Sequence, residues 1–162
     1  MRLLPLKEYQ NYFENCLEML SAFLVEQQEV SGDKRNKSAI TADAKRELVE
    51  RLCDSNRQIF LFENGQTLVG FAEVLLEEEC FPDEDLPESC IKIIYFYILP
   101  QVRRQKLGSV FFKLIRAWGR DKKVALIEAE APNYPIAVNQ FFEKQGLELV
   151  GAGAGNCYRA FI

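Results

Sequence analysis

Hydrophobic positions follow two different spacings along the chain, and the changes between them mark the expected elements. Apolar residues recur at helical spacing in much of the first third and again near 110–120 and 136–145, which is typical of amphipathic helices. Short runs rich in Val, Ile, Phe and Tyr favour strands. The expected strands are 3–6, 58–62, 68–76, 91–99, 124–129, 147–150 and 158–162, and the expected helices are one ending near 28, then 42–53, 110–120 and 136–145. This order, β-α-α-β-β-β-α-β-α-β-β, predicts an α/β (α+β) fold.

Turn and cap residues set the expected boundaries of these elements. Thr41 is a candidate N-cap for the second helix and follows a polar loop over 31–38, since threonine can accept from a free helix N–H. Asn64 and Gly65 form a dipeptide that is typical of a tight hairpin turn. Gly146 follows the fourth helix, where a C-terminal glycine is common.

The segment 100–109, which joins strand 91–99 to helix 110–120, is rich in positive charge. It reads Pro-Gln-Val-Arg-Arg-Gln-Lys-Leu-Gly-Ser, with Arg103, Arg104 and Lys106 as its cations. A helix start offers free N–H groups to an anion, and basic side chains add to that attraction. Gly108 is the only glycine here, so neither the Walker A pattern nor Gly-x-Gly-x-x-Gly fits. The segment predicts a diphosphate-binding turn of another kind.

Length and composition exclude several classes of protein. With 162 residues, 48% of them hydrophobic, the chain suits one core, and we expect a single domain over 1–162. The first residues lack the apolar run of a signal peptide, and no segment approaches the length of a membrane span, so we expect a soluble cytoplasmic protein. Five cysteines without a Cys-x-x-Cys pair and the absence of histidine disfavour a disulfide framework, a metal site and His-dependent nucleophilic catalysis.

Two segments together resemble the GNAT superfamily of N-acetyltransferases. Its acyl-CoA signature is Gln/Arg-x-x-Gly-x-Gly/Ala, in which Arg103 takes the first position, Lys106 stands in place of the first glycine, and Gly108 takes the last. Residues 139–147, Asn-Gln-Phe-Phe-Glu-Lys-Gln-Gly-Leu, resemble the late family segment Phe-Tyr-Glu-Lys-x-Gly-Phe. The order of elements also matches from end to end. The resemblance implies a GNAT fold, with a single mixed central sheet flanked by helices.

The same resemblance implies that acetyl-CoA is the co-substrate. Its pantetheine arm would run between two parallel strands that splay apart, 91–99 and 124–129. By the same resemblance, the N–H of Ile98 would stabilise the oxyanion that forms on the thioester. Pro100 cannot donate, so the donor must lie before it. Asn133 would contact the pantetheine, with turn formation over 132–135 as the alternative. The implied cofactor-binding residues are Tyr97, Ile98, Arg103, Arg104, Gln105, Lys106, Leu107, Gly108, Ser109 and Asn133.

A general base is needed because alkylamines are mostly protonated at neutral pH. Lys92 stands where histone-acetylating relatives keep a catalytic glutamate, and lysine is a poor base unless it is strongly desolvated. The remaining candidates are Glu128 and Glu130 on the second cleft strand, and Glu77 or Glu79 at the end of the preceding one. For Glu128 and Glu130 the alternative is an ordinary polar strand face.

The proton for the leaving thiolate lacks its usual donor. The family tyrosine in the late segment is replaced by Phe142, which cannot donate. Tyr134 and Tyr158 are candidate acids, with a core or rim aromatic as the alternative for each. Water is also sufficient in principle, because a thiolate leaves without much help.

Acidic residues crowd between 77 and 88, without one basic residue among them, in a chain of net charge −4. We expect this loop, with Glu77 and Glu79 as candidate substrate contacts, to attract a cationic amine such as a polyamine, an aminoglycoside-like compound or a lysine-bearing peptide. The alternative is a solvated loop between strands. Neither nucleic acid nor membrane is an expected partner, and a homodimer is one alternative for the assembly.

Two other functions stay open beside the expected N-acetyltransferase, which would transfer an acyl group directly to a primary amine. Lys92 and Phe142 both depart from positions with acid–base roles, which favours a catalytically silent acyl-CoA-binding or regulatory domain. Lys106 departs from the acyl-CoA signature, which favours a fold that no longer binds CoA. Amine-dependent release of CoA separates the enzyme from the silent domain, and failure of acetyl-CoA to stabilise the protein would favour the fold that no longer binds CoA.

Overall fold

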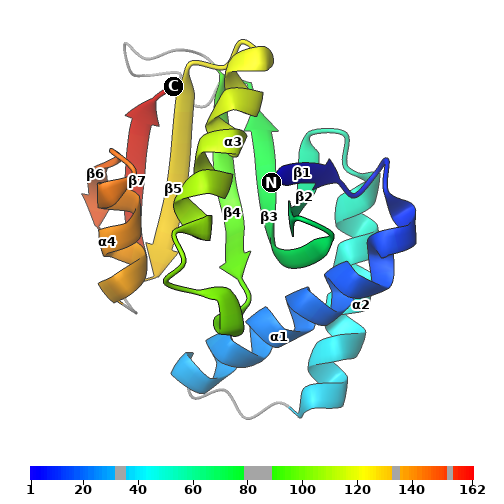
Figure 1. Ribbon diagram of the computed structural model, residues 1–162. Helices are drawn as coiled ribbons and strands as arrows, with labels where there is room; N and C mark the ends of the chain where they lie inside the picture. Colours follow the sequence, from blue (N-terminus) through cyan, green and yellow to red (C-terminus); the bar gives the residue numbers. More distant parts are fainter. Residues whose placement is uncertain (32–35, 79–88, 133–135, 153–154) are drawn as a thin grey trace.

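The computed structural model describes residues 1–31, 36–78, 89–132, 136–152 and 155–162, and its elements are labelled in Figure 1. The strands in these ranges are β1 (Arg2–Pro5), β2 (Arg57–Asn64), β3 (Thr67–Glu77), β4 (Cys90–Ile98), β5 (Leu126–Pro132), β6 (Glu148–Ala152) and β7 (Gly155–Phe161). The helices are α1 (Phe13–Ser31), α2 (Lys37–Cys53), α3 (Leu107–Asp121) and α4 (Ile136–Lys144), with short 3-10 turns η1 (Gln10–Tyr12) and η2 (Pro100–Val102). The predicted order of elements is confirmed.

The strands form one mixed sheet in the order β1-β2-β3-β4-β5-β7-β6. Among the described strands, β4 and β5 pair in parallel and every other neighbouring pair is antiparallel. Helix α3 makes the connection between β4 and β5, as parallel neighbours require a crossover. The predicted fold class, a mixed central sheet flanked by helices, is therefore confirmed.

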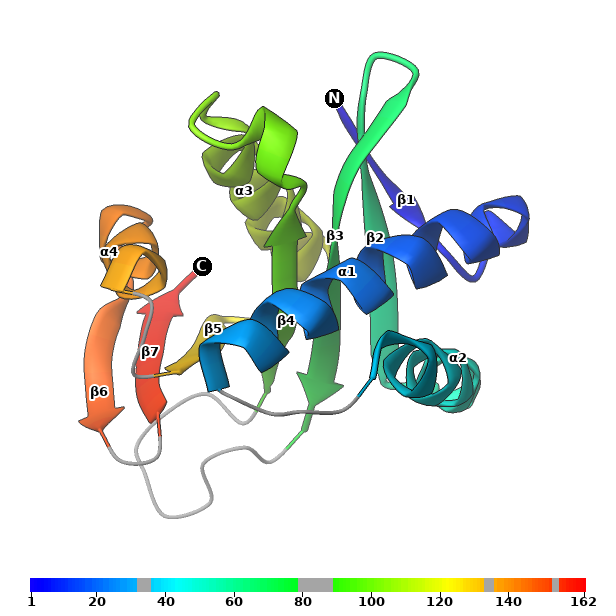
Figure 2. The ribbon, with the colours of Figure 1, turned by 90° about the horizontal axis from the view of Figure 1, so that it is seen from below.

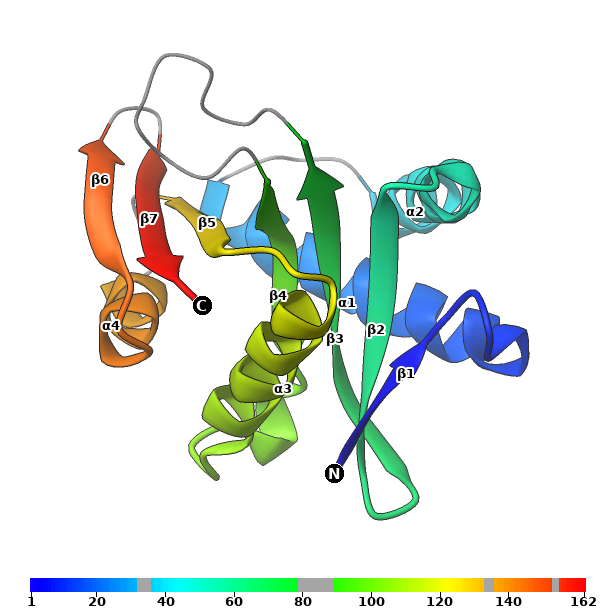
Figure 3. The ribbon, with the colours of Figure 1, turned by 90° about the horizontal axis from the view of Figure 1, so that it is seen from above.

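Helices cover both faces of the sheet and bury two separate apolar clusters. Helices α1 and α2 pack on one face, where Leu17, Leu48 and Phe71 are buried; Figure 2 shows α1 crossing this face beneath β3 and β4. Helices α3 and α4 cover the other face, with Phe111 and Phe142 buried there, and Figure 3 shows α3 from that side. Burial of these apolar side chains is the main stabilising contribution to the fold.

A glycine brings β3 and β4 close together near the end of β4. A Cβ atom added to Gly70 would lie 2.1 Å from the Tyr97 carbonyl oxygen and 3.1 Å from the Ile98 Cα. Any larger residue would force the two strands apart, because neither contact is with a flexible side chain. Gly70 therefore fixes the position of the segment of β4 that leads into η2.

One carboxylate is buried in the sheet on the α1 face. Glu73 of β3 is 1% exposed and accepts a hydrogen bond of 2.7 Å from Arg51 of α2 and another from Arg57 of β2. Arg51 also donates to the Tyr95 hydroxyl on β4, at 3.1 Å. Since an unpaired buried charge is costly, this network ties α2 to β2, β3 and β4.

Two local expectations were wrong in detail. Helix α2 begins at Lys37 rather than Ala42, and its cap is not Thr41 but Asn36, whose side chain accepts from the Ala39 N–H at 2.8 Å. Helix α3 begins at Leu107 rather than Val110. The last three residues of the segment 100–109, called the basic turn below, are therefore helical. In contrast, Asn64 and Gly65 do form the hairpin between β2 and β3, with Gly65 at φ +70°, and Gly146 follows α4 at φ +81°.

The described residues include neither a membrane-spanning helix nor a cluster of metal-binding side chains. No helix in the described ranges combines the length and the apolar character needed to cross a membrane. The same ranges contain no group of three or more His, Cys, Asp or Glu side chains placed to hold a metal ion.

Candidate active site

The parallel strands β4 and β5 separate partway along their length and form a fork. Their pairing runs from Cys90 opposite Leu126 to Ile93 opposite Ala129 and then stops. Beyond this point β5 stays paired with β7 as far as Pro132, while β4 stays paired with β3. The pairing of β3 with β4 skips Ile94, so a β-bulge lies at the apex of the fork, where bulges commonly bend a strand.

The backbone of β4 beyond the bulge has polar groups directed into the fork. The Leu99 N–H donates to the Val69 carbonyl on β3 at 2.9 Å. Because alternate residues of an antiparallel strand face the same neighbour, the N–H and carbonyl of Tyr97 face β3, and those of Phe96 and Ile98 face the β5 side. In the described residues, β5 does not pair with them there. The fork therefore offers main-chain donors to a ligand.

The segment after β4 forms a turn whose N–H groups are available to an anion. Arg104 and Lys106 have positive φ values, 66° and 63°, which non-glycine residues rarely adopt. Lys106 is the N-cap of α3 and its side chain makes no capping hydrogen bond. The first N–H groups of a helix have no intrahelical acceptor, so those of Leu107, Gly108 and Ser109 are left for a ligand. This arrangement fits the diphosphate of CoA.

The side chains of this turn divide into two groups. Arg104, Gln105 and Lys106 are exposed, and the two cations among them extend from the same turn as the free N–H groups. Leu107 is 4% exposed and lies in the core, so only its backbone is available. Gly108 packs against α4: a Cβ atom there would lie 3.3 Å from the Phe141 ring. The Ser109 hydroxyl accepts from the Gln145 side chain at 3.0 Å.

Arg103 lies in the turn but is held by protein groups. Its Nε donates to the Ile98 carbonyl at 2.8 Å, and its terminal nitrogen donates to Glu26 of α1 at 2.8 and 3.0 Å. The Tyr97 hydroxyl donates to the same carboxylate at 2.7 Å. Burial, and then this hydrogen bond, raise the pKa of Tyr97 well above its usual value. The Tyr97 hydroxyl and the terminal nitrogen of Arg103 are thus bonded to Glu26, and the Arg103 Nε is bonded to the Ile98 carbonyl.

A row of alternating charges crosses the strands at the apex of the fork. Lys92 of β4 bonds to Glu77 of β3 at 2.7 Å and lies 3.9 Å from Glu128 of β5, which bonds to Arg159 of β7 at 3.2 Å. Burial alone would lower the pKa of Lys92, but the hydrogen bond to Glu77 and the charges of Glu77 and Glu128 raise it. Lys92 therefore stays protonated at neutral pH and cannot act as a base.

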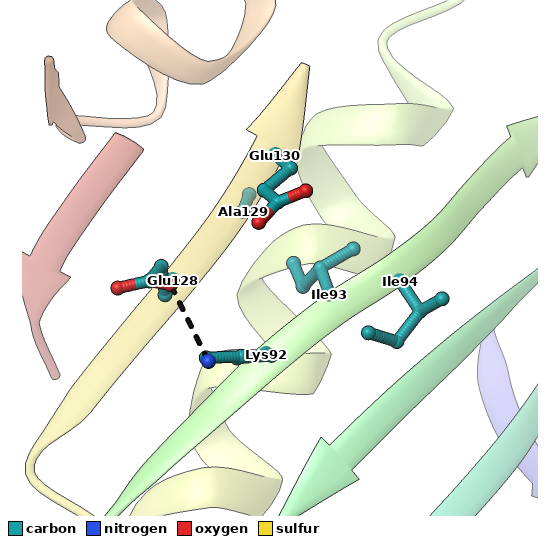
Figure 4. A pocket seen from close by; sticks show the side chains of 6 residues that line it. All are labelled: Lys92, Ile93, Ile94, Glu128, Ala129 and Glu130. Atoms are coloured by element: carbon teal, nitrogen blue, oxygen red, sulfur yellow. Dashed lines mark ion pairs between the residues drawn. The ribbon is translucent and has the colours of Figure 1, made fainter. Parts of the chain in front are cut away.

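A small cavity of about 110 Å³ lies at this apex. Its lining residues are Lys92, Ile93, Ile94, Glu128, Ala129 and Glu130. Figure 4 shows Lys92 and Glu128 facing each other across the two strands, with Glu130 farther along β5. Glu130 is exposed and comes one residue after the last residue that pairs with β4, so it lies in the open part of the fork. Glu128, by contrast, is 6% exposed.

The Cys157 thiol and the Tyr158 hydroxyl are poor candidates for proton transfer. Cys157 of β7 is the cross-strand partner of Glu130, but burial and the charge of Glu128 raise the pKa of its thiol to about 11, which keeps it protonated. The buried Tyr158 hydroxyl donates to the Asn139 side chain at 3.0 Å, and burial, with a contribution from Glu143, raises its pKa. Phe142, at the family tyrosine position, is a core residue 3% exposed.

Not every predicted site residue has a described position. Asn133 and Tyr134, and Glu79 with most of the acidic loop, lie outside the described residues. Sequence reasoning missed Phe96, Glu26 and Arg159. Phe96 could have been found from the alternation of backbone groups along its strand. Glu26 and Arg159 could not, because their partners, Arg103 and Glu128, are distant in sequence.

Several solved structures have the same fold. The PaiA N-acetyltransferase of Thermoplasma acidophilum, solved with coenzyme A, is 13% identical, with 100% of both chains covered and a TM-score of 0.73. The aminoglycoside 6'-N-acetyltransferase AAC(6')-Ig of Acinetobacter haemolyticus is 12% identical, with 94% of each chain covered and a TM-score of 0.70. A transcriptional regulator from Bacillus halodurans is 16% identical, covers 94% of this chain and 97% of its own, and has a TM-score of 0.72. At such identities the likeness establishes the fold alone.

The sequence itself gives the decisive comparison. No curated protein sequence matches the chain. The model of the acetyltransferase (GNAT) family matches residues 17–147, a range that contains most of α1 and all of the fork, the basic turn and α4. This match bears out the resemblance inferred from the turn and the late segment, and the chain belongs to the acetyltransferase (GNAT) family.

Proposed function

We propose that the protein transfers the acetyl group of acetyl-CoA directly to a primary amine, within one domain that spans the chain. One observation carries this proposal: beyond Ile93, the backbone groups of β4 that face β5 are not paired with that strand. They lead from the turn before α3 to the cavity at the apex of the fork, next to the exposed carboxylate of Glu130. A diphosphate, a thioester and an amine can therefore occupy one continuous site. Holding two reactants together in this way can remove several kcal/mol from the barrier.

The turn before α3 would hold the diphosphate. The N–H groups of Leu107, Gly108 and Ser109 are directed away from the helix, and Arg104 and Lys106 add positive charge. Gln105 lies between these two cations and is exposed. Acetyl-CoA supplies the reactive thioester, and the protein supplies binding and orientation. The Arg103 side chain contributes indirectly, since it bonds to Glu26 and Ile98.

A backbone N–H of β4 would stabilise negative charge on the thioester oxygen. Ile98 was expected to do this, and its N–H does face the fork. Phe96 is two residues nearer to the apex, about 7 Å along the strand, and its N–H faces the same side. Because the reactive end of the ligand lies farthest from the diphosphate turn, we assign the oxyanion contact to Phe96 and a pantetheine contact to Ile98. Preorganised donors of this kind supply large catalytic effects.

Glu130 would receive the acceptor amine and remove its proton. It is exposed and lies where the fork is open, whereas the Glu128 carboxylate is occupied by Arg159 and lies near Lys92. The leaving thiolate would take its proton from water; the Tyr158 hydroxyl is bonded to Asn139.

The acceptor class follows from charge at the apex. Glu77, Lys92, Glu128 and Arg159 compensate one another in pairs, which leaves Glu130 as the carboxylate available to an ammonium group. In the sequence, an acidic run starts at Glu77, the residue that pairs with Lys92. A cationic amine is therefore the favoured substrate. The solved aminoglycoside acetyltransferase with this fold acts on such a compound, but the proposal rests on the charges.

A second candidate function is supported by the same apex. Lys92 is neutralised by Glu77 and Phe142 is a core residue, so two positions with acid–base roles in the family are inert here. These features fit an acyl-CoA-binding or regulatory domain without catalysis. The two functions differ in one measurement: only the enzyme releases free CoA at a rate that depends on an added amine.

Acetyl-CoA is expected to stabilise the protein against thermal unfolding. Ligand at 100 times its dissociation constant should add about 2.7 kcal/mol to the free energy of unfolding, which raises the midpoint by roughly 5–10 °C for a chain of this size. The increase should shrink in Arg104→Gln, which removes a cation from the turn. Lys122→Gln, which removes one from the other end of α3, is the control. No increase at millimolar acetyl-CoA would refute the binding site.

Lys106→Gly is expected to stabilise the free protein but weaken acetyl-CoA binding. Glycine adopts positive φ without the cost paid by other residues, about 1 kcal/mol before the entropy of the unfolded chain is counted. Lys123 also has a positive φ, 62°, but lies beyond the C-terminal end of α3. Lys123→Gly should therefore raise the unfolding midpoint similarly, and only Lys106→Gly should raise the dissociation constant, by about threefold. Equal affinities would show that the Lys106 charge does not contact the diphosphate.

A further inference from the structure

A carboxylate on the opposite face of the sheet joins three elements around the basic turn. Glu26 lies on α1, which crosses the face away from α3 (Figure 2). One of its oxygens accepts from the Tyr97 hydroxyl on β4 at 2.7 Å and from Arg103 at 3.0 Å, and the other accepts from Arg103 at 2.8 Å. Tyr97 is 4% exposed, so its hydroxyl needs a partner inside the protein.

These contacts determine which groups Arg103 can reach. Its Nε is bonded to the Ile98 carbonyl at 2.8 Å, and its guanidinium lies 5.3 Å from the centre of the Tyr97 ring. The Ile98 carbonyl faces the fork, where β5 supplies no partner. Arg103 thus satisfies an acceptor that would otherwise be open, while Glu26 neutralises the arginine charge.

The backbone conformation of the turn that follows Arg103 depends on contacts with the surrounding protein. Arg104 and Lys106 both have positive φ, and such conformations in non-glycine residues persist only when surrounding contacts enforce them. Arg103 immediately precedes this strained pair. Its bonds to Glu26 and Ile98 are the described side-chain contacts that fix the start of the turn.

We propose that Glu26 is a positioning residue for acetyl-CoA: through Arg103 it holds the turn in the conformation that presents its N–H groups to the diphosphate. This inference rests on the proposed function. Arg103 therefore shapes the site, and Arg104 and Lys106 supply the cations that face the ligand. The binding site for the co-substrate extends through the sheet to a helix that does not touch the ligand.

Coenzyme A titration by calorimetry tests this role without requiring an acceptor. Glu26→Gln keeps the size of the side chain but loses its charge, and it should weaken CoA binding by about fivefold to tenfold, within the range measured for residues coupled in one network. Glu29→Gln changes an exposed residue of the same helix and should leave affinity unchanged. A wild-type protein that does not bind CoA would refute the proposed function itself.

A double substitution separates positioning through Arg103 from a general loosening of α1. If Glu26 acts through Arg103, the protein with both Glu26→Gln and Arg103→Gln should bind CoA no more weakly than Arg103→Gln alone. Additive losses would overturn the proposal, as would a Glu26→Gln affinity within twofold of the wild type. Tighter binding by Glu26→Gln would also overturn it, since it would mean that Glu26 withholds Arg103 from the diphosphate.

Discussion

Glu130→Gln is expected to lower the rate of amine acetylation by about 100-fold, the usual contribution of a positioned general base. Glutamine has nearly the same shape but cannot accept the proton, so the affinity for acetyl-CoA should stay at the wild-type value. The measurement is kcat for CoA release with a saturating amine acceptor, made beside a calorimetric titration with acetyl-CoA. Glu130 is exposed, so the substitution should not disturb folding.

Glu128→Gln is the matched variant, because it makes the same change two residues earlier on β5. Arg159 and Lys92 already stabilise that carboxylate, and its loss should cost less than tenfold in rate. If instead Glu128→Gln is the slower enzyme, Glu128 is the base and the assignment to Glu130 is wrong. If both variants keep full activity, neither carboxylate is the base, and water removes the proton from the amine.

Gly70→Ala is expected to destabilise the protein by about 3 kcal/mol, because overpacking against rigid groups is costly. The new methyl group would lie 2.1 Å from the Tyr97 carbonyl oxygen, so β3 and β4 would have to move apart. Thermal unfolding should show a midpoint lower by roughly 10 °C. CoA binding should weaken as well, since Ile98 lies at the same contact.

Gly151→Ala provides the control, because it adds the same methyl group to another strand. Its nearest neighbour would be the Cys157 Cβ at 3.8 Å, an ordinary contact. The change in stability should stay within about 0.5 kcal/mol. A similar loss for both variants would attribute the effect to strand glycines in general rather than to the approach of β3 to β4.

Segments with continuous apolar runs were predicted well. The strand expected over 91–99 is observed as Cys90–Ile98, and the basic segment does connect it to a helix. The start of α2 was misplaced because its buried stripe begins with Ile40 and continues through the small Ala44 to Leu48, a pattern that is weak by hydrophobicity alone. Phe111, Phe112 and Ile115, all fully buried, form the inner face of α3.

The parts of the site that could not be predicted depend on geometry or on distant partners. The bulge at Ile94 has no signature in an apolar run, so the end of β4–β5 pairing is visible only in the structure. Arg103 was expected to face phosphate because its charge is evident, but its partner Glu26 lies on α1. Likewise, Glu128 and Glu130 look equivalent in sequence, but in the structure Glu128 is buried and paired with Arg159, whereas Glu130 is exposed.

The fork also bears on how this family can diverge. The donors proposed for the ligand, at Phe96 and Ile98, are main-chain groups, so their chemistry is unchanged when the side chains mutate. What must be inherited is the interruption of pairing after Ile93 and Ala129, a property of strand geometry. Proteins 12–16% identical can therefore share this fold. In the proposed site, the acyl donor is bound by main-chain atoms of β4, whereas the acceptor amine is bound by the side chain of Glu130 on β5. Substitutions can therefore change the acceptor without changing the groups that bind the acyl donor.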